Sequence, residues 1–206
     1  MISINSNKKI GKGIGIFNLP WKKTCPGATK ECKKICYARK REWFKNIKNY
    51  RERNYEASKR DDFEMKLRYE MLKLREKRRM GNYFRIHESG DFYNQKYLNA
   101  WIRIANANSD VTFLAFTRSF KLDFSKRPSS FIVYYSVDKL STNIPKGKIK
   151  VGKIINDKND IPSGYKFCTP VGKDHNLKRD KNHYNYCGTL CKNCWEGKSN
   201  VAFLKH

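Results

Sequence analysis

The chain has 206 residues, 39% of them hydrophobic, and its 45 Lys and Arg against 19 Asp and Glu give a formal net charge of +26. This length suits one domain, or one domain with a small added module, and the hydrophobic content excludes a wholly disordered chain. A positive excess this large destabilises a folded chain unless a polyanion compensates it, so DNA or RNA is the first expected partner. An anionic membrane is the second.

The N-terminal region predicts a cytoplasmic protein without membrane association. Residues 1–15 lack the apolar core of a signal peptide, and no run approaches the roughly 18 apolar residues of a membrane helix. Residues 1–24 read as a Gly- and Lys-rich loop with one short strand over 14–19. Thiols stay reduced in the cytoplasm, so seven bunched cysteines predict metal ligands rather than disulfides.

The first cysteine group follows this loop, with Cys25, Cys32 and Cys36 separated by six and then three residues. Three thiolates on one short loop can bind one face of a cubane cluster and leave one metal position open. Pro26 and Gly27 allow the loop to turn tightly.

Residues 37–79 predict two helices, because Phe63, Leu67, Met71 and Leu74 recur at helical spacing. Asp61 or Asp62 is the expected cap of the second helix. Residues 38–79 hold 16 Lys and Arg against 8 Asp and Glu, which indicates either a solvent face laced with salt bridges or a surface that follows phosphates. The aromatic residues of this stretch are expected in the core more often than as exposed platforms for bases. They are Tyr37, Trp43, Phe44, Tyr50 and Tyr55.

Strands and a helix alternate in the next part of the chain. Strands are predicted over 83–87, 111–116, 131–135 and 149–155, and a helix over 94–106. This order predicts an α/β fold, either a partial (βα) barrel or an open parallel sheet, with basic helices and a cysteine-rich metal-binding tail. We expect an α/β domain over 1–160 and a tail over 161–206 that packs on the same domain and folds around metal.

The tail carries the second cysteine group. Cys187, Cys191 and Cys194 are separated by three and then two residues, and Cys168 lies upstream. Four thiolates complete a closed zinc site or an iron–sulfur cluster. Only one interval has the two-residue spacing typical of zinc knuckles, which favours iron–sulfur, of the 4Fe–4S type, over zinc. In another partition, one cluster draws ligands from both ends of the chain.

Polar clusters at 87–91, 117–119 and 136–138 follow the predicted strands, where parallel sheets carry their functional loops. His87, Glu88 and Asp91 are candidates for binding a divalent cation or for acid–base chemistry, and Arg118 is a candidate for binding a phosphate. In the structural alternative, Asp91 or Ser89 caps the next helix, His87 fills the strand end, and Arg118 pairs with Asp91 or Glu88.

Several motifs resemble those of the gene-product-88-like proteins of phages and plasmids, over about residues 13–196. They are CPGAT with the cysteines and the CYA that follow it, RIHESGDF, and FTRS. This resemblance implies a protein of a mobile element. A weaker similarity is to radical S-adenosylmethionine enzymes, which place a three-cysteine loop before a partial barrel. It implies a cofactor-binding turn at Ser89 and Gly90, although the cysteine spacing differs and the turn lacks a double glycine.

Three functions fit these observations. The first is a nucleic-acid-binding iron–sulfur or zinc protein that contacts DNA or RNA mainly through phosphates. The second is a metal-dependent nuclease or another nucleic-acid-modifying enzyme. The third is a radical S-adenosylmethionine-like enzyme.

Overall fold

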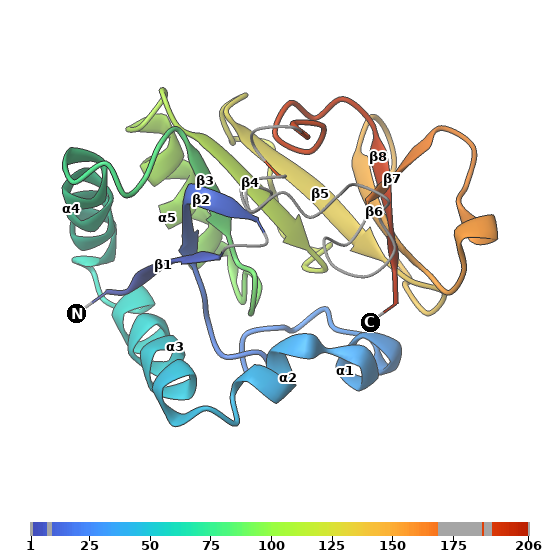
Figure 1. Cartoon of the computed structure of the whole chain (residues 1–206), viewed down its shortest axis with the longest axis horizontal. Coiled ribbons are helices and arrows are strands. Elements are labelled where there is room, and N and C mark those ends of the chain that lie inside the picture. Colours follow the sequence, from blue (N-terminus) through green and yellow to red (C-terminus); the bar gives the residue numbers. More distant parts are fainter. Residues whose placement is uncertain (1, 8–9, 169–186, 188–190, 206) are drawn as a thin grey trace, which may run out of the picture.

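A computed structural model describes residues 2–7, 10–168, 187 and 191–205. They form one mixed α/β unit built on an eight-stranded sheet, in the order β1-β2-β3-β4-β5-β6-β8-β7 (Figure 1). The strands are β1 (Ile4–Asn7), β2 (Gly11–Phe17), β3 (Tyr83–Ile86), β4 (Thr112–Thr117), β5 (Phe131–Val137), β6 (Lys150–Ile155), β7 (Tyr165–Cys168) and β8 (Asn200–Leu204). Only β1 pairs antiparallel, with β2, so the predicted α/β class with a mostly parallel sheet is confirmed.

The helices precede or connect the strands. They are α1 (Lys30–Ile35), α2 (Tyr37–Arg41), α3 (Lys45–Ser58), α4 (Phe63–Glu76), α5 (Gln95–Asn106) and the short 3-10 helix η1 (Lys158–Asp160). Three helices therefore occupy residues 37–79, where two were predicted. The break between α2 and α3 comes at Phe44, whose backbone is extended. The Glu42 side chain, at the end of α2, accepts bonds from the Trp21 amide and from Arg51, both at 3.1 Å.

One face of the sheet packs against α4 and α5. Trp101 of α5 is fully buried at the centre of this core, with its ring 5.5 Å from Phe17 and 5.7 Å from Phe84. The apolar face predicted for α4 is confirmed, since Phe63, Leu67 and Met71 belong to the same cluster. Asp62 stands at the N-cap of α4, as expected, but its side chain makes no capping bond.

The other face of the sheet carries a second, smaller core. Ile14, Ile16, Leu114, Tyr134 and Val201 pack there with Trp195 from the tail. Apolar side chains thus cover both faces, which explains why the strands are nearly continuous apolar runs.

The described part of the tail packs on the main domain. β7 and β8 extend the main sheet, and the Trp195 ring lies 4.8 Å from that of Tyr83 in a tilted contact. Metal binding by the tail stays a prediction. Residues 169–186 and 188–190 of the predicted tail lie outside the described residues.

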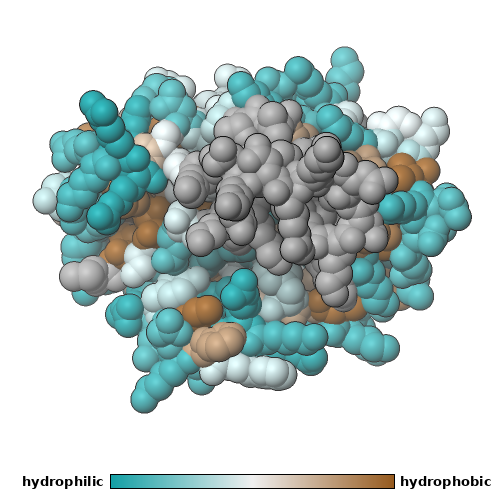
Figure 2. All heavy atoms as spheres, viewed as in Figure 1, coloured by the Kyte–Doolittle hydropathy of each residue, from teal (hydrophilic) through white to brown (hydrophobic). Residues whose placement is uncertain are grey.

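Hydrophilic side chains dominate the surface over α3 and α4 in the view of Figure 2. In the described residues, every helix is too short or too polar to span a lipid bilayer.

Candidate metal centre

The first cysteine group lies on a loop that rests on the carboxyl ends of β3 and β4. A Cβ added to Gly27 would lie 1.9 Å from the Arg118 carbonyl oxygen, so only glycine lets the loop approach β4 this closely. A Cβ on Gly90 would lie 2.6 Å from that of Leu19, and the Leu19 amide donates to the Ser89 carbonyl at 2.9 Å. The loop is therefore fixed against both strand ends.

Thr29 fastens α1 to the end of β5. Its hydroxyl oxygen accepts the Cys32 amide at 3.0 Å, which caps α1, and its hydroxyl donates to the Asp138 carboxylate at 2.6 Å. Burial opposes ionisation of Asp138, but the Thr29 bond and the Arg118 charge bring its pKa below the ordinary value. The helix that carries Cys32 is thus anchored at a strand end by a residue that the spacing argument did not identify.

The three thiols of this group are half-buried neighbours. Burial raises the pKa of Cys25 far above its usual range, and Asp91, Cys32 and Cys36 raise it further. Burial also raises the pKa of Cys32, although the Arg118 charge opposes that rise. Without a compensating cation these thiols stay protonated, and a bound metal ion supplies the charge that favours thiolates.

The second cysteine group gathers at the end of β7 and in the segment before β8. Burial raises the pKa of Cys168 to about 12, with Cys194, Cys187 and Cys191 contributing. Burial likewise raises the pKa of Cys194 to about 12. The backbones of Cys187 and Cys191 pair through an isolated parallel β-bridge. The electrostatic neighbours of each thiol therefore divide the seven cysteines into a group of three and a group of four.

The chemistry of these donors fits a thiophilic metal. All seven cysteines are free thiols, and each group contains half-buried members that raise one another's pKa. Across the described ranges, however, no set of three or more His, Cys, Asp or Glu side chains is arranged closely enough to hold a metal ion. Iron–sulfur or zinc binding by these cysteines stays a prediction.

His87 lies inside an aromatic cluster at the end of β3. Its side chain is only 3% exposed, its Nε2 lies 2.8 Å from the Tyr97 hydroxyl, and its ring meets Phe92 edge-on at 4.9 Å. Burial and the nearby Arg85 lower the pKa of His87 to about 3, so the imidazole is neutral near pH 7. These contacts favour the structural alternative for this residue.

Asp91 joins the ends of β3 and β4. Its carboxylate accepts the Thr117 hydroxyl at 2.6 Å and the backbone amides of Phe92 and Arg118, both at 2.7 Å. Burial raises its pKa to about 6 despite these bonds. The expected cap of α5 is wrong: Asn94, rather than Asp91 or Ser89, accepts the Tyr97 amide at the start of that helix.

Arg118 pairs with a different acid from those expected. Its guanidinium binds the Asp138 carboxylate at 2.9 Å and the Ser141 hydroxyl at 3.2 Å, and its side chain is 6% exposed. Its Nη2 is buried without a hydrogen-bond partner in the described structure. The predicted pairing with Asp91 or Glu88 is wrong for the side chain, because β5 brings Asp138 to the guanidinium while Asp91 takes the Arg118 amide.

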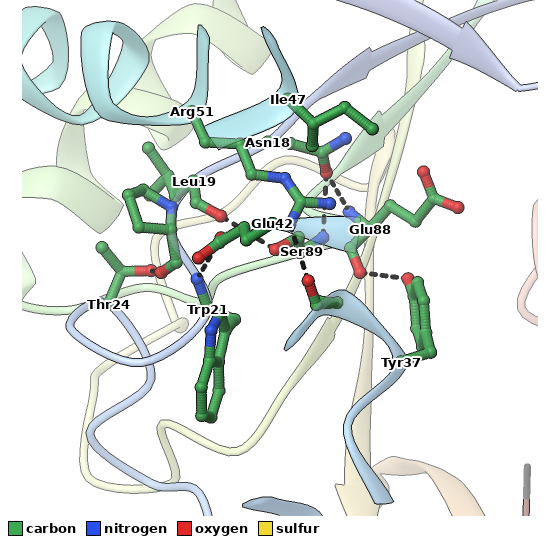
Figure 3. Close-up of polar contacts among 12 residues, drawn as sticks. Asn18, Leu19, Trp21, Thr24, Tyr37, Glu42, Ile47, Arg51, Glu88 and Ser89 are labelled. Atoms are coloured by element: carbon green, nitrogen blue, oxygen red, sulfur yellow. Dashed lines mark hydrogen bonds and ion pairs between the residues drawn. The ribbon is translucent and has the colours of Figure 1, made fainter. Parts of the chain in front are cut away.

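The turn after β3 is held by backbone-directed contacts, which Figure 3 shows. Asn18 accepts the amides of Glu88 and Ser89 at 2.7 and 2.9 Å, and the Ser89 hydroxyl donates to the Leu19 carbonyl at 2.9 Å. The Tyr37 hydroxyl donates to the Glu88 carbonyl. The polar atoms of Ser89 therefore connect the turn to the cysteine loop.

Arg85 was missed by the sequence reasoning, although a charged residue inside the apolar strand 83–86 was a signal. Its guanidinium stacks over the Phe116 ring at 4.2 Å, on the sheet face that carries the smaller core. Its charge counteracts the rise in pKa that burial imposes on Cys187 and Cys194. Arg85 thus lies beside the second cysteine group.

Exposed cations run along residues 30–48, the segment that contains Cys32 and Cys36. We call these eight the basic strip: Lys30, Lys33, Lys34, Arg39, Lys40, Arg41, Lys45 and Lys48. The two acids of this stretch are engaged elsewhere, Glu31 by Lys205 and Glu42 by Arg51. No basic-strip cation forms an ion pair with any described residue.

Several cations of α4 behave differently. Lys66 and Lys73 pair with acids of their own helix region, and Arg75 pairs with Asp110. The salt-bridged alternative therefore describes these cations of α4. The cations at 77–79, after α4, resemble the basic strip in forming no ion pair with a described residue.

The link between α2 and α3 carries two exposed aromatic side chains. Trp43 is 78% exposed and Phe44 is 59% exposed, contrary to the core position expected for them. Tyr55 packs edge-on against Tyr93 at 5.3 Å, which agrees with the expectation. Tyr37 is 42% exposed, so the exposed aromatics of residues 37–55 all lie within the segment of the basic strip. Tyr69 on α4 is exposed away from it.

Comparisons with known proteins agree with the resemblance seen in the motifs. The family model described as gene product 88 matches residues 2–200. The Gene 88 protein of Mycobacterium phage L5 is 30% identical over 203 residues, and that of phage D29 is 29% identical over 197 residues. Each match covers 87% of this chain and 81% of the relative. No solved structure matches.

These matches give no support to the weaker similarity with radical S-adenosylmethionine enzymes. They span nearly the whole chain and agree with one another in the family they indicate. The chain belongs to the gene product 88 family.

Proposed function

We propose that this protein binds DNA or RNA in the cytoplasm, mainly through phosphates, and that a cysteine-ligated metal centre braces the binding surface. The basic strip carries this proposal, because it places eight exposed cations, without acid partners in the described chain, on one continuous segment. Such a surface attracts a polyanion and releases its counterions on binding.

The metal centre and the basic strip share the same short helices. Cys32 lies within α1 and Cys36 lies between α1 and α2, while Lys33, Lys34 and Arg39 are exposed on those helices. Helices of six and five residues are too short to be stable alone. A metal bound by Cys25, Cys32 and Cys36 would supply a covalent crosslink that holds these cations in place, and we favour iron–sulfur over zinc.

The contacts of the polar cluster support binding rather than nuclease action. His87 is buried and neutral, all three bonds to Asp91 are internal, and Arg118 is held by Asp138. Each group has a structural partner in the folded chain. Cleavage of the bound strand would instead favour the nuclease alternative.

The first test measures how affinity depends on salt. Replacing Lys34, Arg39 and Arg41 by Gln should lower the slope of log affinity against log salt by about 2–3, since each phosphate contact contributes about 0.7–0.9. The matched control replaces Lys77, Arg78 and Arg79 by Gln. This variant loses the same number of charges just after α4, at the end of that helix away from α1 and α2 in Figure 1. Equal slopes for the two variants would refute a role for the basic strip.

The second test concerns strand preference. Trp43 and Phe44 offer exposed rings next to the basic strip, and a ring that stacks on a base contributes about 1–3 kcal/mol. We expect Trp43→Ala to weaken binding of a single-stranded oligonucleotide roughly tenfold and to affect a duplex less. The matched control is Tyr69→Ala on α4, which is 60% exposed.

The third test identifies the metal. Anaerobically purified protein should contain iron and sulfide and absorb broadly in the visible range, and Cys32→Ser should lose that absorption together with nucleic-acid affinity. Colourless protein with stoichiometric zinc would show that the centre is a zinc site rather than an iron–sulfur cluster. Metal-free protein with undiminished affinity would refute the bracing role.

A further inference from the structure

An open pocket of about 630 Å³ lies at the carboxyl ends of β5 and β6. Its volume falls within the roughly 300–1,000 Å³ typical of small-molecule sites, and in parallel α/β sheets such sites lie beyond the carboxyl ends of the strands. Of the residues that line the pocket, only Val137 and Asp138 belong to a polar cluster that the sequence indicated. The pocket is therefore a candidate site that the sequence alone did not indicate.

One wall of the pocket is apolar. Val137 at the end of β5, Val151 and Ile155 on β6, and Ile144 from the connection between them line it. Ile144 remains 38% exposed although it is a large aliphatic residue. A flat, weakly polar ring system would cover this surface.

The charges of the pocket leave it net positive. Asp138 pairs with Arg118 and accepts the Thr29 hydroxyl, whereas Asp160 accepts only the Asp157 amide, at 3.1 Å in the cap of η1, and has no cation partner among the described residues. The two cations of the pocket, Lys139 and Lys153, form no ion pair with any described residue and outnumber Asp160. An apolar wall beside this excess of lysine is complementary to a ligand that joins a ring to an anionic group.

The pocket borders α1 and hence the basic strip. Asp138 on its rim binds Thr29, the cap of α1. Ile155 accepts the Lys205 amide at 2.9 Å, and the Lys205 side chain binds Glu31 of α1 at 2.5 Å. The pocket therefore lies next to α1, where the basic strip begins.

We propose that this pocket receives a single nucleotide, with its base against Val151, Ile155 and Ile144 and its phosphate on Lys139 and Lys153. The nucleotide comes either from the bound strand, in which case the inference rests on the proposed function, or from free nucleoside monophosphate. Both sources present the same ring and phosphate to the same residues.

The experiment titrates the full chain with nucleoside 5′-monophosphates and, as probes of each half, with nucleosides and inorganic phosphate. Lys139→Gln with Lys153→Gln should weaken monophosphate binding roughly tenfold or more, because both charged contacts to the phosphate are lost. Ile144→Asp should weaken it as well and leave inorganic phosphate binding less affected. Ile144 and Lys139 are exposed and Lys153 is half-buried, and a melting curve verifies that the variants keep their fold.

The same variants are then tested with a short oligonucleotide. If the variants weaken binding of the oligonucleotide as well as of the monophosphate, the nucleotide in the pocket comes from the bound strand. If they weaken only the monophosphate, the source is free nucleotide, and the pocket holds even if the basic-strip variants fail. Unchanged binding of both probes in Lys139→Gln with Lys153→Gln and in Ile144→Asp would overturn the inference while leaving the basic-strip result intact.

Discussion

Asp91→Ala should destabilise the protein strongly, because this carboxylate holds two strand ends together. The substitution leaves three donors without their acceptor: the Thr117 hydroxyl and the amides of Phe92 and Arg118. Each buried amide that loses its acceptor costs about 1–3 kcal/mol, and the hydroxyl can rotate toward another acceptor. The expected loss in the free energy of unfolding is about 3–5 kcal/mol.

Equilibrium urea unfolding at neutral pH measures this loss, with Asp91→Asn as the milder comparison because its amide oxygen keeps one acceptor. A loss below about 1 kcal/mol for Asp91→Ala would refute the bridging role. Full stability combined with lost cleavage activity would assign Asp91 a chemical role instead.

The carboxyl of Asp91 should also make stability depend on pH. Burial raises its pKa in the folded state to about 6, from 3.8 as the reference value. The folded state therefore holds this proton more tightly than the unfolded state, and the contribution to stability falls as pH rises from about 4 to about 6. The full shift in pKa corresponds to a change of about 3 kcal/mol in the free energy of unfolding. The stability difference between wild type and Asp91→Asn should change with that sign across this window, and a pH-independent difference would contradict it.

Three further substitutions probe the packing around the cysteine loop. Gly27→Ala places a methyl group on the Arg118 carbonyl, so the loop must lift and Cys25 should react faster with a thiol reagent; Gly81→Ala, whose nearest contact is at 3.8 Å, is the control. Thr29→Val removes the cap of α1 and the bond to Asp138, and should lower stability by about 1–2 kcal/mol in thermal unfolding. Trp101→Ala empties the centre of the larger core, and should cost about 3–5 kcal/mol in urea unfolding.

The central strands and α5 were predictable because their signals are local. The runs at 83–87, 111–116 and 131–135 are apolar and end in polar turns, and the observed strands differ from them by only one or two residues at either end. β1, β7 and β8 were missed because four or five residues carry little periodicity. Their strand conformation depends on pairing with neighbours that the local sequence does not reveal.

The location of the polar cluster was predictable, but the partners of its side chains were not. Parallel strands bring residues 87–91, 117–119 and 136–138 to one edge, as expected. The acid that pairs with Arg118 depends on which strand lies beside β4, and the neighbouring β5 brings Asp138 to the guanidinium. The pocket was not predictable because its lining comes from β5, from β6, from the connection between them and from residues 156–165, which are separated in the sequence.

The position of β8 constrains the order in which the chain can assemble. β8 lies between β6 and β7, and β7 pairs with β8 alone among the described strands. During synthesis, β7 therefore has no sheet partner until residues 200–204 have left the ribosome. Cys168 lies at the end of β7 and reaches its final position only when β7 pairs with β8. The second cysteine group therefore assembles after the rest of the sheet.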